Sequence, residues 1–118
     1  MASKRNVIEL HDGIIFYTQA GDQSGEAVTH SVNAIRLLAD GMPEVKILVD
    51  YTHSGKLSKE ALQAGFYALK DINFDKVAIF GASPYMRKLV NTMASAAGKG
   101  HIIHFAKTRK EAQEWLNK

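Results

Sequence analysis

The chain has 118 residues, of which 46% are hydrophobic and 23% are charged, so it has the size and composition of one globular domain with a sizeable core. It contains no cysteine, which excludes disulfides and thiolate chemistry, and the sequence predicts neither a metal site nor a cofactor. The net charge is +3, but basic and acidic residues alternate along the chain, so a mixed solvated surface is favoured over nucleic-acid binding.

No segment has the pattern of a membrane span or an export signal. No apolar run approaches the roughly 20 residues that cross a bilayer. The basic residues near the N-terminus do not precede an apolar stretch of signal-peptide length. We therefore expect a cytoplasmic protein that does not insert into a membrane.

A β-hairpin is predicted at the N-terminal end. Apolar, β-rich runs over residues 7–10 and 14–18 flank Asp12-Gly13, and glycine tolerates the positive φ that a tight turn requires. A polar loop is expected over residues 20–25. Apolar residues at helical spacing then predict a helix over residues 24–39, which is followed by a Gly and a Pro.

The remaining chain alternates predicted strands and helices. Strands are expected over residues 45–51, 76–80 and 101–106, and helices over residues 57 or 58 to 72, 83–97 and 108–117. The order ββαβαβαβα predicts an α/β fold, a single domain over residues 1–118 with a mixed, mostly parallel five-stranded sheet and four helices. Four helices can cover one face fully and the other only in part. Either a helix crosses over, or an apolar patch remains for a ligand or for a second copy in a homodimer.

Two strand-to-helix junctions carry polar residues. The apolar run 47–49 leads through Asp50 into Tyr51-Thr52-His53-Ser54-Gly55-Lys56, and the run 77–80 leads into Gly81-Ala82-Ser83-Pro84. In an open α/β sheet, ligands bind at the carboxyl ends of the strands, where such junctions lie. The first junction is the candidate segment for a partner or ligand, and its residues are Asp50, Tyr51, Thr52, His53, Ser54, Gly55, Lys56 and Ser58.

Ser54 is the candidate phosphoacceptor of this segment, with Thr52 and Ser58 as alternates. A phosphate on the loop would meet the N-terminus of the second helix and Lys56 or Lys59, which is a favourable electrostatic setting. The simpler interpretation is that these hydroxyl groups cap the helix, as Ser and Thr commonly do.

The second junction is a candidate anion site. The backbone amides at Gly81 and Ser83 could bind an anion, with Arg87 nearby. The alternative is a plain helix start, with Ser83 as the N-cap and Pro84 as the first helical residue, and it explains every residue there.

A catalytic role is the weaker interpretation of the first junction. Asp50, His53 and Ser54 are the residue types of a hydrolase triad, but residues this close in one loop rarely reach triad geometry. For Asp50 we favour a turn-stabilising role. His101 and His104 stand three apart on a predicted strand, so they point to opposite faces and do not chelate a metal together. We therefore expect a protein that is not an enzyme.

Three segments carry a resemblance to a known family. They read KILVDYTHSGKLSKEALQAG, DKVAIFGASPYMRKLV and HFAKTRKEAQEWL. With this order of elements, the chain resembles a STAS domain and, more narrowly, the SpoIIAA-like bacterial proteins. The resemblance covers nearly the whole chain and implies the same α/β architecture.

The resemblance also implies a function. Members of the fold family that are understood act as anti-sigma-factor antagonists, transporter modules or stressosome components. The resemblance therefore implies a non-enzymatic regulatory or interaction module. Its implied partner is a kinase or another regulatory protein. Their regulatory serine lies at the start of the second helix, in an Asp-Ser-Ser/Gly-Gly pattern. Here Ser54-Gly55 keeps the Ser-Gly pair, separated from Asp50 by three residues. The CRAL-TRIO lipid carriers share the broad fold, which implies a carrier of a lipid-like or other apolar ligand as the alternative and leaves a small hydrolase as the weaker one.

Overall fold

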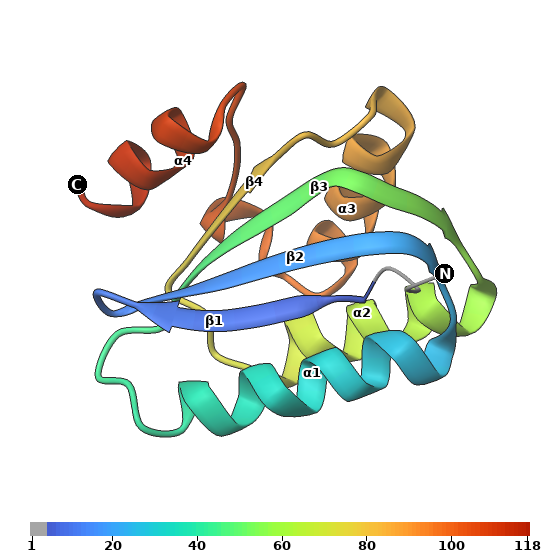
Figure 1. Cartoon of the computed structure of the whole chain (residues 1–118), viewed down its shortest axis with the longest axis horizontal. Helices are drawn as coiled ribbons and strands as arrows, with labels where there is room; N and C mark the ends of the chain where they lie inside the picture. The colour runs from blue at the N-terminus through green and yellow to red at the C-terminus, as the bar shows by residue number, and fades with distance from the viewer. Residues whose placement is uncertain (1–4) are drawn as a thin grey trace.

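A single five-stranded sheet forms the centre of the protein, in a computed structural model that describes residues 5–118 (Figure 1). Its strands lie in chain order, and they are β1 (Val7–His11), β2 (Ile14–Gln23), β3 (Lys46–Leu57), β4 (Lys76–Phe80) and β5 (Ile103–Phe105). β1 pairs with β2 antiparallel, and β2 to β5 are mutually parallel, which confirms the predicted hairpin and sheet. The turn of the hairpin has positive φ at both Asp12 and Gly13, as a tight two-residue turn requires.

The four predicted helices are confirmed, and each begins at a side-chain cap. They are α1 (Gly25–Ala39), α2 (Lys59–Asp71), α3 (Pro84–Ala96) and α4 (Arg109–Leu116). The N-cap residues of the four helices are Ser24, Ser58, Ser83 and Thr108. The hydroxyl oxygen of each N-cap accepts a hydrogen bond from the backbone N–H three residues later. The caps satisfy amides that have no partner inside the helix, which explains where each helix starts.

The helices divide unequally between the two faces of the sheet. α1, α2 and α3 cover one face, where Ile15, Ile47 and Ile79 of the strands form the larger core. α4 lies across the sheet from α1 and α2, and its Ala112 and Leu116 pack on a smaller core that includes Ile14, Phe16, Leu48 and Ala78 (Figure 1). Of the two arrangements that the sequence left open, the one in which a helix crosses over is therefore correct.

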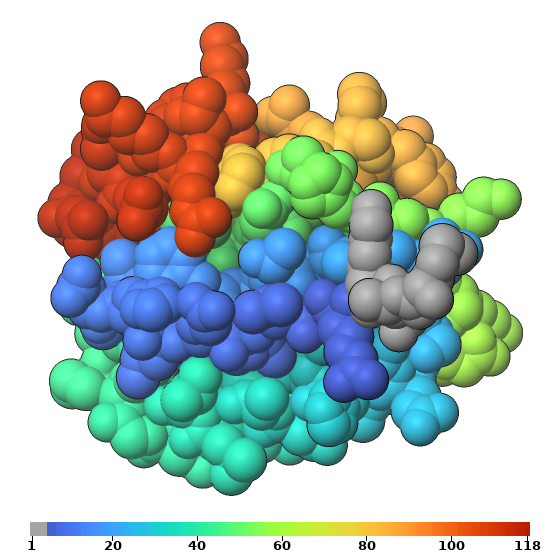
Figure 2. Space-filling model, in the orientation of Figure 1, coloured from blue at the N-terminus to red at the C-terminus, as the bar shows by residue number. Residues whose placement is uncertain are grey.

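α4 covers only part of its face. In the space-filling view, atoms of β3 and β4 reach the surface between α4 and α3, and β1 forms an outer edge above α1 (Figure 2). The carboxyl ends of β3 and β4 are therefore accessible from outside the molecule.

Two of the predicted boundaries are wrong for the same reason. Residues 20–25 were expected as a loop, but β2 continues to Gln23, and β3 continues through the predicted loop to Leu57. The two extensions pair with each other through two register shifts, so polar residues without an alternating pattern still satisfy their backbone groups. The predicted strand over residues 101–106 is also shorter, because Gly100–Ile102 forms one turn of 3₁₀ helix before β5.

Candidate functional site

The two strand-to-helix junctions meet in one surface depression of about 230 Å³. Because β3 and β4 are parallel neighbours, their carboxyl ends lie side by side, and the segments that follow them share this surface. The depression, which we call the junction depression, is lined by Tyr51, Thr52, Ser54, Gly55, Lys56 and Leu57 from β3 and by Gly81, Ser83, Tyr85 and Met86 from the second junction.

Gly81 brings the second junction against the first. Its backbone has a φ of +75°, and a Cβ atom built at this position would overlap the backbone nitrogen and side chain of Thr52. Only glycine combines this conformation with such a close approach, because it lacks the Cβ atom. The contact of Gly81 with Thr52 therefore fixes one wall of the junction depression.

β2 holds the other side of the segment. The Asp22 carboxylate accepts a hydrogen bond of 2.8 Å from the Lys56 backbone N–H, and the Gln23 carbonyl accepts one of 3.0 Å from the Ser58 N–H. Within the segment, the Asp50 carboxylate accepts a hydrogen bond of 2.8 Å from the Thr52 N–H, which is the local stabilising contact expected of Asp50. Because of these hydrogen bonds, the segment that was expected to be a loop extends β3 and has a defined conformation.

A buried polar network lies behind the junction depression. The Ser54 hydroxyl donates to the Gln19 side-chain oxygen at 2.9 Å, and the Gln19 amide donates to the Tyr17 hydroxyl at 2.8 Å. Gln19 is only 3% exposed, and burial raises the pKa of the Tyr17 phenol, an effect that hydrogen bonds to Gln19 and Ser31 oppose. Sequence reasoning did not identify Gln19. Its alternation with Ile15 and Tyr17 is the signal that places it on the covered face of β2.

The serine residues of the segment occupy distinct positions. Ser58 caps α2 through a hydrogen bond of 3.0 Å from the Ala61 N–H, as the capping interpretation requires. Ser54 lies within β3, four residues earlier, which separates it from the start of α2 by roughly 13 Å of extended chain. A group on Ser54 is therefore not placed at the N-terminus of α2, contrary to the expectation from the predicted loop.

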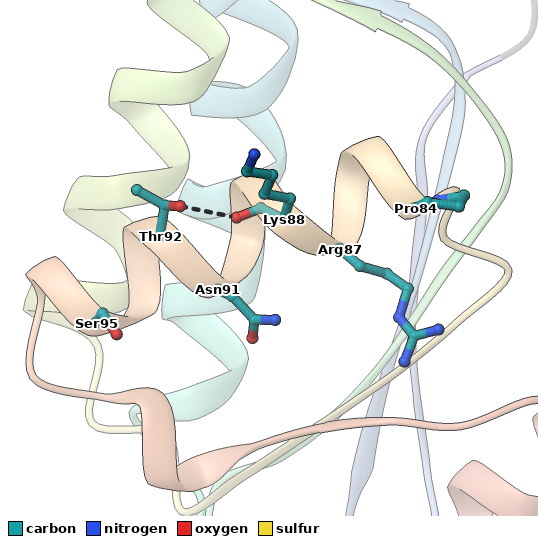
Figure 3. A pocket seen from close by; sticks show the side chains of 6 residues that line it. All are labelled: Pro84, Arg87, Lys88, Asn91, Thr92 and Ser95. Carbon is teal, nitrogen blue, oxygen red and sulfur yellow. Dashed lines mark hydrogen bonds between the residues drawn. The ribbon is translucent and has the colours of Figure 1, made fainter.

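The three residues of the predicted anion site do not come together. Gly81 and Ser83 line the junction depression, but Arg87 lies outside it, with its guanidinium carbon 5.1 Å from the centroid of the Phe105 ring. Met86 is the residue of this turn that faces the depression, and Arg87 is about 100° further around the helix. Arg87 instead lines the shallow outer face of α3 together with Pro84, Lys88, Asn91, Thr92 and Ser95 (Figure 3).

The hydrolase interpretation is not supported by the contacts of its three residues. The Ser54 hydroxyl donates to Gln19, Asp50 accepts from the Thr52 backbone, and His53 is exposed at the neighbouring strand position. Adjacent residues of a strand point to opposite faces, so His53 is not oriented toward Ser54. Of the two histidines expected on the fifth strand, His101 lies in the 3₁₀ turn and His104 stacks on Trp115 at 4.8 Å between ring centroids.

Tyr51 lines both the junction depression and an apolar cavity. The cavity lies between the sheet and helices α1 to α3 and has a volume of about 90 Å³. Desolvation raises the pKa of the Tyr51 phenol far above its usual value, and the nearby Tyr17 phenol adds to the shift. Pockets that bind drug-sized molecules have volumes of roughly 300 Å³ or more, so the cavity does not support the lipid-carrier alternative.

Within residues 5–118, no helix combines the length and apolar character needed to cross a bilayer. No curated protein matches the chain in sequence. Among solved structures, it is similar to an uncharacterised protein of the DUF3478 family with a SpoIIAA-like fold from Shewanella loihica PV-4, at 20% identity and a TM-score of 0.71, over 98% of both chains.

Two structures of SpoIIAA are also similar to this chain. One is the anti-sigma factor antagonist SpoIIAA in its unphosphorylated form, at 14% identity and a TM-score of 0.67, over 95% of this chain and 97% of that one. The other is the Bacillus cell fate determinant SpoIIAA in its phosphorylated form, at 16% identity and a TM-score of 0.68, over 94% and 98% of the two chains. The SpoIIAA-like family model matches residues 14–117, and the chain belongs to the SpoIIAA-like family.

Proposed function

We propose that this protein is a non-enzymatic regulatory module that binds a protein partner through the junction depression and the first turn of α2. The observation that carries the proposal is that both strand-to-helix junctions form one accessible surface at the carboxyl ends of β3 and β4. Similarity to an anti-sigma factor antagonist and membership of its family support a regulatory role over a catalytic one. The partner is then a regulatory protein such as a kinase.

The charge of this surface favours an acidic partner. Lys56 lines the junction depression and Lys59 begins α2, and both side chains are exposed. The nearby Asp22 and Asp50 carboxylates accept hydrogen bonds from backbone N–H groups of the same segment, which partly offsets their negative charge. Exposed charges at an interface act mainly by steering association and selecting partners.

Photo-crosslinking in the source cells tests the partner surface. We expect p-benzoylphenylalanine in place of Tyr85, which lines the junction depression and is 71% exposed, to capture a protein partner. The same crosslinker in place of Leu37, which is 77% exposed on α1, is the control and should not capture that protein. With the purified partner, Lys56→Glu is expected to weaken binding by about tenfold. Equal capture from both positions, or binding unchanged by Lys56→Glu, would contradict the proposal.

We further propose that phosphorylation regulates this module at Ser58. SpoIIAA, which has a similar structure, exists in unphosphorylated and phosphorylated forms. The resemblance matches the regulatory Ser-Gly pair of the family with Ser54-Gly55, but the residue that stands at the start of the second helix, where the family's serine lies, is Ser58. Phosphate oxygens on Ser58 can still accept the Ala61 N–H and would lie beside Lys59 at the positive end of α2. Phosphorylation of Ser54 would instead remove the donor of its hydrogen bond to the buried Gln19.

Mass spectrometry of the protein purified from its own cells tests this assignment. We expect a phosphate on the peptide that contains Ser58, lost in Ser58→Ala and retained in Ser54→Ala. Phosphate on Ser54 would refute the choice of residue, and the absence of phosphate throughout residues 50–58 under every growth condition would refute phosphoregulation of the segment.

A further inference from the structure

α2 and α3 leave an apolar groove between them on the outer surface, with a volume of about 350 Å³. We call it the α2–α3 groove. It is lined by Lys59, Leu62, Gln63, Phe66 and Tyr67 from α2 and by Leu89, Thr92, Met93 and Ala96 from α3. The groove shares no lining residue with the junction depression, and it begins at Lys59 in the first turn of α2.

The walls of the α2–α3 groove have the spacing of helix ridges. Leu62 and Phe66 stand four residues apart on α2, and Leu89 and Met93 stand four apart on α3, so each pair forms one ridge along its helix. All four side chains are only partly buried by the protein itself. A helix of the length of α2, which has 13 residues, extends over about 20 Å, enough to accept a partner helix of three to four turns.

Positive charge gathers at one end of the α2–α3 groove. α2 and α3 each follow one of two parallel strands, so they run in the same direction and their N-terminal ends lie together. The Met93 side chain reaches Gly65 of α2, since a Cβ atom built on Gly65 would lie 3.8 Å from the Met93 methyl carbon. By helical spacing, Lys59 of α2 and Lys88 of α3 then lie near the same end.

Acidic residues do not balance this charge within the groove. Its lining contains no Asp or Glu, and α3 contains none along its length. Glu60 of α2 is turned toward the other side, where it lies against Gly25 at the start of α1. A partner segment that complements the α2–α3 groove therefore has an apolar face and acidic side chains near one end.

We infer that the α2–α3 groove binds an amphipathic helix of the protein partner, with its apolar side chains between the two ridges and Asp or Glu side chains beside Lys59 and Lys88. This inference rests on the proposed function, because it names the kind of partner segment that the module recognises. Helix-in-groove recognition uses this combination of spaced apolar anchors and flanking charge. A second copy of the chain that docks by the same groove fits less well, because the groove lining offers no Asp or Glu to Lys59 and Lys88.

Crosslinking from within the groove tests the inference. Tyr67 lines the α2–α3 groove and is 57% exposed, so p-benzoylphenylalanine in its place should react with whatever occupies the groove. We expect the crosslinked peptide to come from a protein partner and to have apolar residues at helical spacing with at least two acidic residues near one end. A synthetic peptide of that segment should then bind the purified protein, and the double variant Lys59→Glu with Lys88→Glu should weaken its binding by about tenfold or more.

Controls separate this inference from the proposed function. Lys110→Glu reverses a charge on α4, across the sheet from the groove, and should leave peptide binding unchanged. A crosslink from position 67 to a lipid, to another copy of this chain or to a basic segment would overturn the inference, as would binding that is insensitive to the double variant. If position 85 captures a partner and position 67 captures none, the α2–α3 groove is not used but the proposed function stands. If neither position 85 nor position 67 captures a protein, both the proposed function and the inference about the groove are wrong.

Discussion

Replacing Gly81 with alanine is expected to lower the free energy of unfolding by about 3 kcal/mol. One part of the cost is conformational, because an L-residue at the Gly81 φ of +75° is strained by roughly 1 kcal/mol. The larger part is steric, because the new Cβ atom would overlap the backbone nitrogen of Thr52, and a backbone cannot move aside as a flexible side chain can. To relieve the overlap, the two junctions would have to separate, and the junction depression would change shape.

Urea unfolding followed by circular dichroism measures this loss, and Gly98 provides a matched control. Gly98 has nearly the same φ, +72°, but no atom lies within 4 Å of a Cβ built there. Gly98→Ala should therefore cost only the conformational part, about 1 kcal/mol. If the two variants lose equal stability, the close packing of Gly81 on Thr52 contributes nothing, and the junction depression is not held as described.

Replacing Leu116 with alanine is expected to cost about 3 kcal/mol of unfolding free energy. Leu116 is fully buried in the smaller core, and α4 has only eight residues, so this side chain is a principal anchor of the helix. An isolated helix of that length is not stable in water, so loss of the anchor should let α4 detach before the rest unfolds.

The fluorescence of Trp115 reports this detachment directly. Trp115 is the single tryptophan, and its indole stacks on His104 of β5. In Leu116→Ala we expect the fluorescence transition to occur at lower urea concentration than the circular dichroism transition. Leu37→Ala, at a position 77% exposed on α1, should change stability by no more than about 0.5 kcal/mol. Coincident transitions in Leu116→Ala would show that α4 and the main body unfold as one unit.

The local features of the fold could be predicted from the sequence because their causes lie within a few residues. Asp12-Gly13 indicates the hairpin turn, and Ser83-Pro84 marks the start of α3, since each pattern satisfies a local backbone requirement. Alternation of strands and helices along the chain then required parallel pairing. The resemblance to SpoIIAA-like proteins is confirmed by the family match.

The candidate segment forms the C-terminal part of β3, a conformation that was not predicted. Residues 51–57 lack the apolar alternation of a strand, and they form one because they pair with β2, more than thirty residues away. The Asp22 carboxylate, which accepts a hydrogen bond from the Lys56 N–H, and the Gln19 side-chain oxygen, which accepts one from the Ser54 hydroxyl, are likewise remote in sequence. The binding role of this segment and the phosphorylation of Ser58 remain predictions for the experiments above.

The sequence by itself determined the class of fold, the order of the elements, the helix caps and the family, because these follow from local chemistry and from periodicity. The tertiary structure decided that Gly81 meets Thr52, that Arg87 lies outside the junction depression, and that α4 crosses to the other face. The physical reason is that these features depend on which distant surfaces pack together, and no pattern within a single segment of the chain specifies that choice.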